Sequence, residues 1–144
     1  MPVTTSVTLA STARGMTATM TFSGSMTRAG TNALVDGNYQ LTINGGLIRS
    51  LNTTKTFDAD GDGSGGGLYT LGTQAADNFF ALLGDANGNG EVDAQDLLAA
   101  KLALRKTIGQ AGYNSAYDVN GNGVVDAQDI LNIQLNLRKK RVFF

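Results

Sequence analysis

Cysteine, histidine and tryptophan are absent from this 144-residue chain, and proline occurs once. Without thiols and imidazoles, the chain has no disulfides, no Ser-His-Asp triad, no cysteine nucleophile and no ordinary zinc or haem site. A bound metal ion must therefore take its ligands from oxygen atoms, which favours hard cations.

Charged residues are also scarce, at 16 % of the chain against about 25 % in an average protein. The 11 basic and 12 acidic residues give a formal net charge of −1, so no basic surface for nucleic acid is predicted. No apolar run approaches the ~20 residues of a membrane-spanning helix. The N-terminus shows no basic segment followed by an apolar one, so no signal peptide is visible in this chain.

The first half of the chain is rich in Thr and Ser, and its apolar residues alternate with polar ones. This period of two predicts half-buried β-strands, which we place at 3–9, 16–22 and 39–43. Segments 47–48 and 68–71 predict two further short strands. Turns are predicted at 11–15 and 36–38, which gives an antiparallel sheet of four or five strands.

That sheet resembles the second half of an immunoglobulin-like β-sandwich, because a complete sandwich needs about seven strands. An independent small sheet packed on the second half of the chain is an equal alternative. Both interpretations place a β-sheet domain at residues 1–78.

The second half contains an internal repeat, in which residues 85–96 recur as 118–129 with an offset of 33. Each copy precedes a segment with apolar residues at helical spacing, so each repeat is predicted to be a loop followed by a helix. Asp93 and Asp126 are suited to cap the two helices, and Gly109 is predicted to end the first one. Basic residues follow each helix, where the negatively polarised C-terminal end stabilises positive charge.

Each repeat loop has oxygen-bearing side chains at positions 1, 3, 5, 9 and 12 and glycine at position 6. This is the spacing of a calcium loop, because alternating residues point inward while the glycine allows a sharp bend. The backbone carbonyl supplies the ligand at position 7. The predicted ligands are Asp85, Asn87, Asn89, Glu91, Asp93 and Asp96 in the first loop, and Asp118, Asn120, Asn122, Val124, Asp126 and Asp129 in the second.

A single loop of this kind could be an Asn- and Gly-rich turn that caps a helix and binds nothing. Two copies that retain all five side-chain ligand types favour metal binding. Calcium is preferred over magnesium, because Mg²⁺ resists the high coordination number that these loops offer. The predicted cofactor is two calcium ions. A third loop is a candidate site for one more ion.

That third loop contains Asp58, Asp60 and Asp62, and it begins like the other two. However, Tyr69 occupies its twelfth position, and no helical pattern follows. Two interpretations remain open. The three acids bind a third calcium ion, with help from Asp77, or the loop is a solvated turn that precedes a flexible glycine-rich stretch at 64–67.

The repeats GDANGNGEVDAQDLL and YDVNGNGVVDAQDIL resemble the duplicated calcium-binding loop-helix of the type I dockerin family, over about residues 79–144. The strands before them are similar to the β-sandwich ends that precede such modules in large bacterial surface proteins. The fold class is therefore expected to be α+β, with a β-sheet domain at 1–78 and a dockerin-like module at 79–144.

The dockerin resemblance implies a protein partner of the cohesin type, and either of two symmetry-related faces could bind it. In this family the contacts lie at loop positions 10 and 11 and at later helix positions. The residues at those positions are Ala94, Gln95, Lys101, Leu102 and Lys106 in the first repeat, and Ala127, Gln128, Gln134, Leu135 and Lys139 in the second.

The leading hypothesis is a non-catalytic, calcium-stabilised interaction module of an extracellular or cell-surface protein. The alternative is a structural module that docks on its own β domain without an external partner. A calcium sensor fits less well, because the repeats lack the methionines of an exposed sensor groove. A glycosidase also fits poorly, because Glu91 is the only glutamate and most acids lie in the three loops.

Apolar residues lie at both ends of the predicted module. Phe79 and Phe80 precede the first loop, and residues 142–144 end the chain with Val-Phe-Phe. We expect these two clusters to pack together, because burying a phenylalanine contributes about 1.5–3 kcal/mol.

Overall fold

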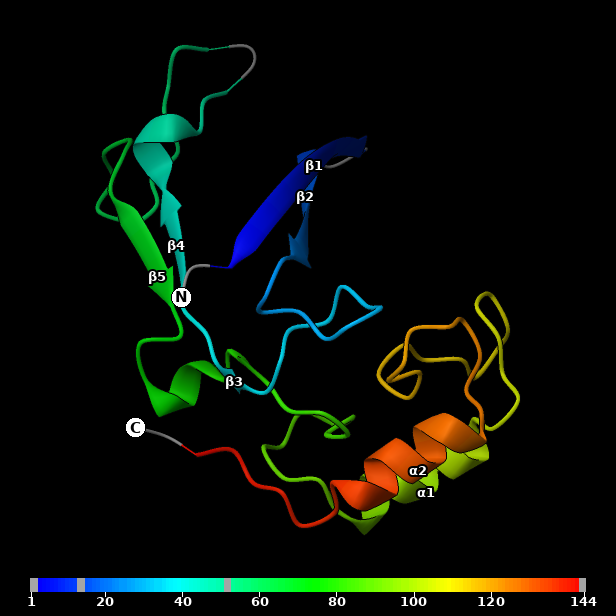
Figure 1. Cartoon of the computed structure of the whole chain (residues 1–144). Helices are drawn as coiled ribbons and strands as arrows, with labels where there is room; N and C mark the ends of the chain where they lie inside the picture. The colour runs from blue at the N-terminus through cyan, green and yellow to red at the C-terminus, as the bar shows by residue number, and fades with distance from the viewer. Residues whose placement is uncertain (1–2, 13–14, 51–52, 143–144) are drawn as a thin grey trace. The chain divides into compact units, whose positions relative to one another are not determined.

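The computed structural model describes residues 3–12, 15–50 and 53–142 (Figure 1). Short antiparallel β-pairs precede two α-helices, so the predicted α+β class is confirmed. The chain divides into two compact units. One contains the described residues up to Gly37 together with Ala81–Val142, and the other is built from Asn38–Phe80. The boundary predicted between residues 78 and 79 stays a prediction.

The first unit begins with a hairpin of β1 (Thr4–Thr12) and β2 (Gly15–Ser23). The antiparallel register runs from Thr4 opposite Ser23 to Thr12 opposite Gly15, which confirms the two predicted strands. Val7 and Leu9 are 55 % and 65 % exposed. The expectation that β1 is half-buried is therefore wrong, because among the described residues no third strand pairs with this hairpin and covers its apolar side chains.

The second unit contains β4 (Leu41–Asn44) and β5 (Leu68–Leu71), two strands that were predicted and that pair antiparallel. A strand at 47–48 is not found, because the 3₁₀ helix η1 (Gly45–Leu47) begins where the Asn44 side chain accepts the Gly46 N–H at 3.0 Å. The η2 helix (Ala75–Asp77) follows β5.

A short strand, β3 (Gly37–Asn38), takes the place of the predicted turn at 36–38 and pairs with β6 (Phe80–Ala81). The described β-strands therefore form three separate two-stranded sheets. The prediction of a single sheet of four or five strands is wrong for the described residues, since no strand there pairs with two neighbours.

The glycine-rich stretch at 64–67 is held in place within the second unit. The Ala59 N–H donates to the Gly66 carbonyl at 2.9 Å, and the Gly66 N–H donates to Phe57 at 2.8 Å. A Cβ atom at Gly65 would collide with Thr56, and one at Gly67 would collide with the Asp60 carboxylate. These glycines let neighbouring groups approach closely. The stretch therefore forms a hydrogen-bonded turn, and its flexibility stays a prediction.

Two nine-residue helices follow the repeat loops, α1 (Ala94–Leu102) and α2 (Ala127–Leu135). Asp93 and Asp126 cap them as predicted, and each forms a reciprocal capping box with the aspartate three residues later. The prediction that Gly109 ends the first helix is wrong. The helix ends at Leu102, and Arg105 reverses the chain with a left-handed φ of 68°.

The repeats bond to each other in a reciprocal way. The Arg105 N–H donates to the Val125 carbonyl at 2.7 Å, and the Arg138 N–H donates to the Val92 carbonyl at 2.8 Å. The end of each helix therefore lies against the loop that begins the other helix, which makes α1 and α2 antiparallel neighbours (Figure 1). Between them Val92, Ala100 and Ile133 are fully buried and form the centre of the core.

Within the described residues, neither α-helix is long or apolar enough to cross a lipid bilayer. Phe143 and Phe144 lie outside the described residues. The expected packing of the chain end on Phe79 and Phe80 therefore stays a prediction.

Candidate metal centre

The first repeat loop is wound around the side chain of Asp85. Its Oδ1 accepts the Gly88 N–H at 2.8 Å and the Asn89 N–H at 3.1 Å, and its Oδ2 accepts the Gly90 N–H at 2.8 Å. Gly88 and Gly90 take left-handed φ angles of 74° and 88°, which turn these N–H groups inward. Asn87 and Asn89 accept further backbone N–H groups two residues later.

The second repeat loop has a similar geometry around Asp118, except that the Gly121 N–H donates to the Asp118 backbone carbonyl at 3.2 Å. This carboxylate accepts the Asn122 N–H at 3.1 Å and the Gly123 N–H at 2.8 Å, and it is 7 % exposed. Gly121 and Gly123 have φ angles of 71° and 90°, close to their counterparts in the first loop. The two copies of the sequence therefore fold as two copies of one loop.

A tyrosine that the sequence analysis did not assign supports the second loop. Tyr113 donates its hydroxyl hydrogen to Asp118 Oδ2 at 2.8 Å. Burial raises the pKa of the Tyr113 phenol, and the hydrogen bond to Asp118 raises it further, as do the negative charges of Asp118 and Asp129. The repeat offset places Phe80 at the matching position of the first loop, so only the second loop has this hydroxyl donor.

The last carboxylate of each loop is buried at the base of its helix. Asp96 and Asp129 are 1 % and 0 % exposed. Asp96 accepts the N–H groups of Ala86 and Asn87 on one oxygen and that of Asp93 on the other. Asp129 repeats this arrangement, because it accepts the N–H groups of Asn120 and Asp126. Each loop is thus closed onto its helix through one buried side chain.

These buried carboxylates have no cationic side chain beside them. In the described ranges, no ion pair involves Asp96, Asp118 or Asp129. Burying a carboxylate without a compensating positive charge is costly, so a cation in the loop fits these residues. The other predicted ligands are the carboxylates of Asp85, Asp93 and Asp126, the Asn side chains and backbone carbonyls, and such an oxygen-only set suits calcium.

Asp126 lies at the ninth position of the second loop and caps α2. Hydrogen bonds from the Gln128 N–H and the Asn122 side chain hold the pKa of its carboxyl below the ordinary value, against a smaller opposing effect of burial. Because Asp126 stays ionised to lower pH than a free aspartate, it is available as an oxygen ligand.

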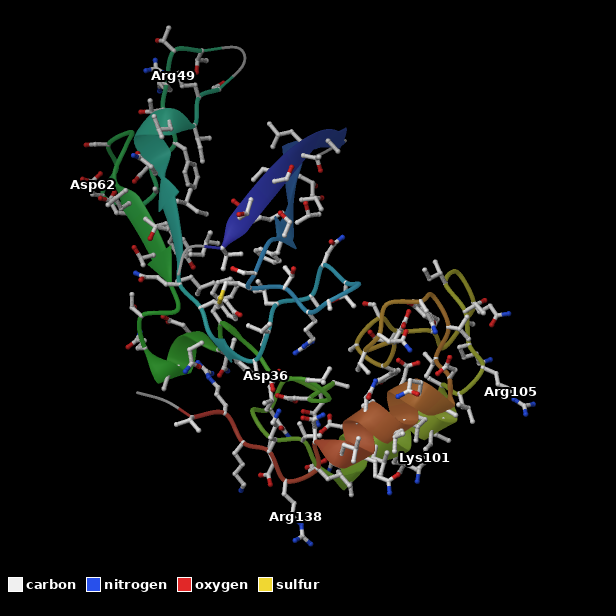
Figure 2. All side chains as sticks on the ribbon, in the orientation of Figure 1. Asp36, Arg49, Asp62, Lys101, Arg105 and Arg138 are labelled. Atoms are coloured by element: carbon white, nitrogen blue, oxygen red, sulfur yellow. The ribbon has the colours of Figure 1, made fainter. Side chains whose placement is uncertain are left out.

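The third loop begins with the same backbone geometry. Asp58 accepts the N–H groups of Gly61, Asp62 and Gly63 at 2.8, 3.2 and 2.9 Å. Gly61 and Gly63 have φ angles of 76° and 88°. The carboxylates of Asp58, Asp60 and Asp62 each offer an oxygen within 4.8 Å of the others, and Asp62 extends from the loop in Figure 2.

The third loop does not close as the repeat loops do. Tyr69, at its twelfth position, lies in β5 and is 43 % exposed. Asp77, which was considered as a further ligand, caps its own turn and accepts the N–H groups of Gly72, Thr73 and Gln74. The carboxylates of the third loop are therefore all at least partly exposed: Asp58 is partly exposed, and Asp60 and Asp62 are exposed.

The ten residues considered for partner binding lie on α1, α2 and the turns that follow them. Nine of these side chains are exposed, and Lys106 is partly exposed. The two large apolar side chains among them, Leu102 and Leu135, are 76 % and 75 % exposed.

Asp36, which the sequence analysis did not single out, connects three parts of the first unit. Its carboxylate accepts hydrogen bonds from Arg28, from Lys139 Nζ and from the Leu83 N–H, each at 2.8 Å. Burial raises the pKa of Asp36, but the hydrogen bonds from Lys139, Arg28 and Leu83 together lower it below the ordinary value. Figure 2 shows Asp36 on the segment that precedes β3.

Comparison with known proteins identifies the repeat region. Residues 83–138 match the family model described as the dockerin type I domain. This segment therefore has the sequence of a dockerin type I domain, as the repeats indicated. Domains of this family are calcium-dependent, non-catalytic modules for protein–protein interaction. Neither the curated proteins nor the solved structures contain a match to the chain.

Proposed function

We propose that this chain is a non-catalytic, calcium-binding attachment module of an exported or cell-surface protein, which binds a cohesin-like partner through its dockerin segment. The observation that carries this proposal is the pair of buried carboxylates, Asp96 and Asp129, which have no cationic side chain beside them among the described residues. Calcium would supply the missing charge and lock each loop onto its helix.

Each repeat loop would hold one ion through the same five side chains and one backbone carbonyl. The buried aspartate at position 12 binds from the base of the helix, and the asparagines supply neutral oxygens. The proposed ligands are Asp85, Asn87, Asn89, the Glu91 carbonyl, Asp93 and Asp96 in one loop, and Asp118, Asn120, Asn122, the Val124 carbonyl, Asp126 and Asp129 in the other.

Titration calorimetry of the chelator-treated protein with calcium tests the number of ions. The wild type should bind two ions tightly, and Asp85→Ala or Asp118→Ala should each remove one of them. A wild-type count of zero would refute the metal assignment. A third, weaker binding event that Asp60→Asn abolishes would assign calcium to Asp58, Asp60 and Asp62, whose role stays open.

The partner class is tested by pull-down of the whole chain against a panel of cohesin domains. We expect at least one cohesin to be retained in calcium and released by EGTA. Retention that is indifferent to EGTA would contradict a calcium-organised binding surface. A double variant, Asp85→Ala with Asp118→Ala, serves as the matched negative control, because it should lose binding even with calcium present.

The structural alternative has one observation in its favour. Asp36 bonds to Lys139 and to the Leu83 N–H, so the N-terminal segment of the same unit already contacts the repeat region. If no cohesin binds, and if calcium still raises the melting temperature of the chain, the module would serve as an internal structural element.

A further inference from the structure

The reciprocal packing of the repeats gives the dockerin segment two related ends. The Val125 N–H donates to the Lys106 carbonyl, and the Val92 N–H donates to the Lys139 carbonyl, both at 2.9 Å. The end of α1 therefore adjoins the start of α2, and the end of α2 adjoins the start of α1.

We call the surface where the end of α1 meets the start of α2 the basic end. It is formed by Lys101, Leu102, Arg105, Lys106, Ala127 and Gln128. We call the second such surface the paired end, formed by Gln134, Leu135, Arg138, Lys139, Ala94 and Gln95.

Apolar exposure does not distinguish the two ends. Leu102 at the basic end and Leu135 at the paired end are 76 % and 75 % exposed. Arg105 and Arg138 also match each other, since both have left-handed backbones and both point away from the helices (Figure 2). A partner that recognised only these groups would bind either end equally well.

Charge does distinguish the two ends. At the paired end, Lys139 bonds to Asp36 at 2.8 Å and the adjacent Lys140 bonds to Glu91 at 2.9 Å. The counterpart of Lys101 there is the neutral Gln134. At the basic end, Lys101, Arg105 and Lys106 take part in none of the ion pairs formed by the described residues.

The acids of the second loop do not offset this difference. Asp126 and Asp129 lie beside the basic end, but their counterparts Asp93 and Asp96 lie beside the paired end, so these proposed calcium ligands contribute the same charge to both ends. The Lys140–Glu91 ion pair of the paired end also has no counterpart at the basic end. Thr107 stands at the position that matches Lys140, and Val124 at the position that matches Glu91.

We propose that the two ends are not equivalent, and that the partner docks on the basic end with an apolar patch rimmed by carboxylates. This inference rests on the proposed attachment function and names the face and the chemistry of its partner. Leu102 supplies the apolar contact, and the three unpaired cations select an acidic rim. At the paired end, Asp36 already neutralises the Lys139 ammonium, which leaves less charge there for an acidic rim.

Matched charge-neutralising variants of the whole chain test this choice. Glutamine is used because a glutamate at position 139 would face Asp36. With a cohesin that binds the wild type, Lys106→Gln should weaken binding at least fivefold, and the double variant Lys101→Gln with Lys106→Gln at least tenfold at low salt. Lys139→Gln should change binding less than twofold, and Lys55→Gln, in the other unit, provides a baseline. Equal losses at 106 and 139, or a larger loss at 139, would overturn the inference while leaving the attachment function intact.

A second measurement decides the inference even if no cohesin binds. The calcium-loaded chain, labelled with ¹⁵N, is titrated with a soluble peptide of alternating Glu and Leu as the acidic apolar probe. Amide shifts confined to the basic end would support the inference. Shifts that are equal at both ends, larger at the paired end or absent from both would overturn it. Helical circular dichroism confirms that each variant is folded before it is compared.

Discussion

The third loop and the first repeat loop start alike and finish differently. Asp58 and Asp85 each accept three N–H groups from the same relative positions, and the glycines that present them have nearly the same φ angles. The first repeat loop then reaches Asp96, which is buried in the first turn of α1 and completes its capping box. The third loop reaches Tyr69 on a strand. Six residues therefore fix the local backbone, while the twelfth connects the loop to the rest of the fold.

Calcium removal should separate the two kinds of loop most strongly. With EGTA the repeat region should lose its helical circular dichroism, because the carboxylates of each loop repel one another and two nine-residue helices are marginal alone. Amide signals from β4 and β5 should persist, because their pairing does not pass through a repeat loop. Helix content that EGTA leaves unchanged would show that the loops do not depend on metal.

The buried twelfth residue should matter more than an exposed loop carboxylate. Asp129→Asn should abolish one tight calcium site and destabilise the repeat region by about 3 kcal/mol or more, because an amide cannot replace a buried carboxylate that accepts two backbone N–H groups. Asp62→Asn, in the third loop, should cost less than about 0.5 kcal/mol. Chemical denaturation in calcium measures both variants, and similar costs would remove the distinction between the loops.

Tyr113 offers a smaller test within the repeats. Tyr113→Phe removes the hydroxyl that donates to Asp118, so the second loop should resemble the first, where Phe80 stands at the matching position. We expect calcium affinity at the second loop to fall by about tenfold, which is typical for the loss of a group that orients a metal ligand. Calorimetry should show the first site unchanged. A loss at both sites would indicate a general loss of stability instead.

Asp36 lies outside all three loops and should have the smallest effect. Asp36→Asn should destabilise the calcium-loaded first unit by about 0.2–1 kcal/mol, because its ion pairs are partly exposed. The pKa of Asp36 is lowered in the folded state. The contribution of Asp36 to the free energy of unfolding is therefore fully present above the pKa that this carboxyl has in the unfolded state. It is lost as the pH falls through the lower pKa of the folded state. The stability difference between wild type and variant should accordingly shrink in acid, and a constant difference would contradict this role.

The repeat region was predictable because its signals are local. Asp93 and Asp126 cap their helices through N–H groups two residues away, and spacing alone reveals such contacts. Asp96 and Asp129 close their loops onto the helices, and their burial depends on the packing of both repeats. Their role as calcium ligands stays a prediction. Helix termination was less predictable, because Arg105 takes a left-handed conformation that usually favours glycine.

The N-terminal half was only partly predictable. Alternation located β1, β2, β4 and β5, because strand periodicity is also local. It gave no information on which strands pair, and in the part of the chain that the structure describes three separate pairs replace the expected single sheet. Tyr113 escaped detection although Asp118 is only five residues away, because the first repeat has Phe80 at the matching position and the repeat pattern gives no signal there. Asp36 escaped detection for a reason related to strand pairing. Asp36 and Lys139 are 103 residues apart in the sequence, and the sequence pattern around either residue does not predict their contact.

The reciprocal bonds between the repeats have a consequence for how this module could have arisen. Each helix end donates to the loop of the other copy, through Arg105 to Val125 and through Arg138 to Val92, so one 33-residue unit alone would leave both its helix end and its loop without a partner. The same bonds could form between two identical chains. The dockerin segment is in this sense a symmetric dimer fused into one polypeptide. Its asymmetric features, such as Glu91 opposite Val124 and Lys101 opposite Gln134, are differences that only a fused pair can acquire independently.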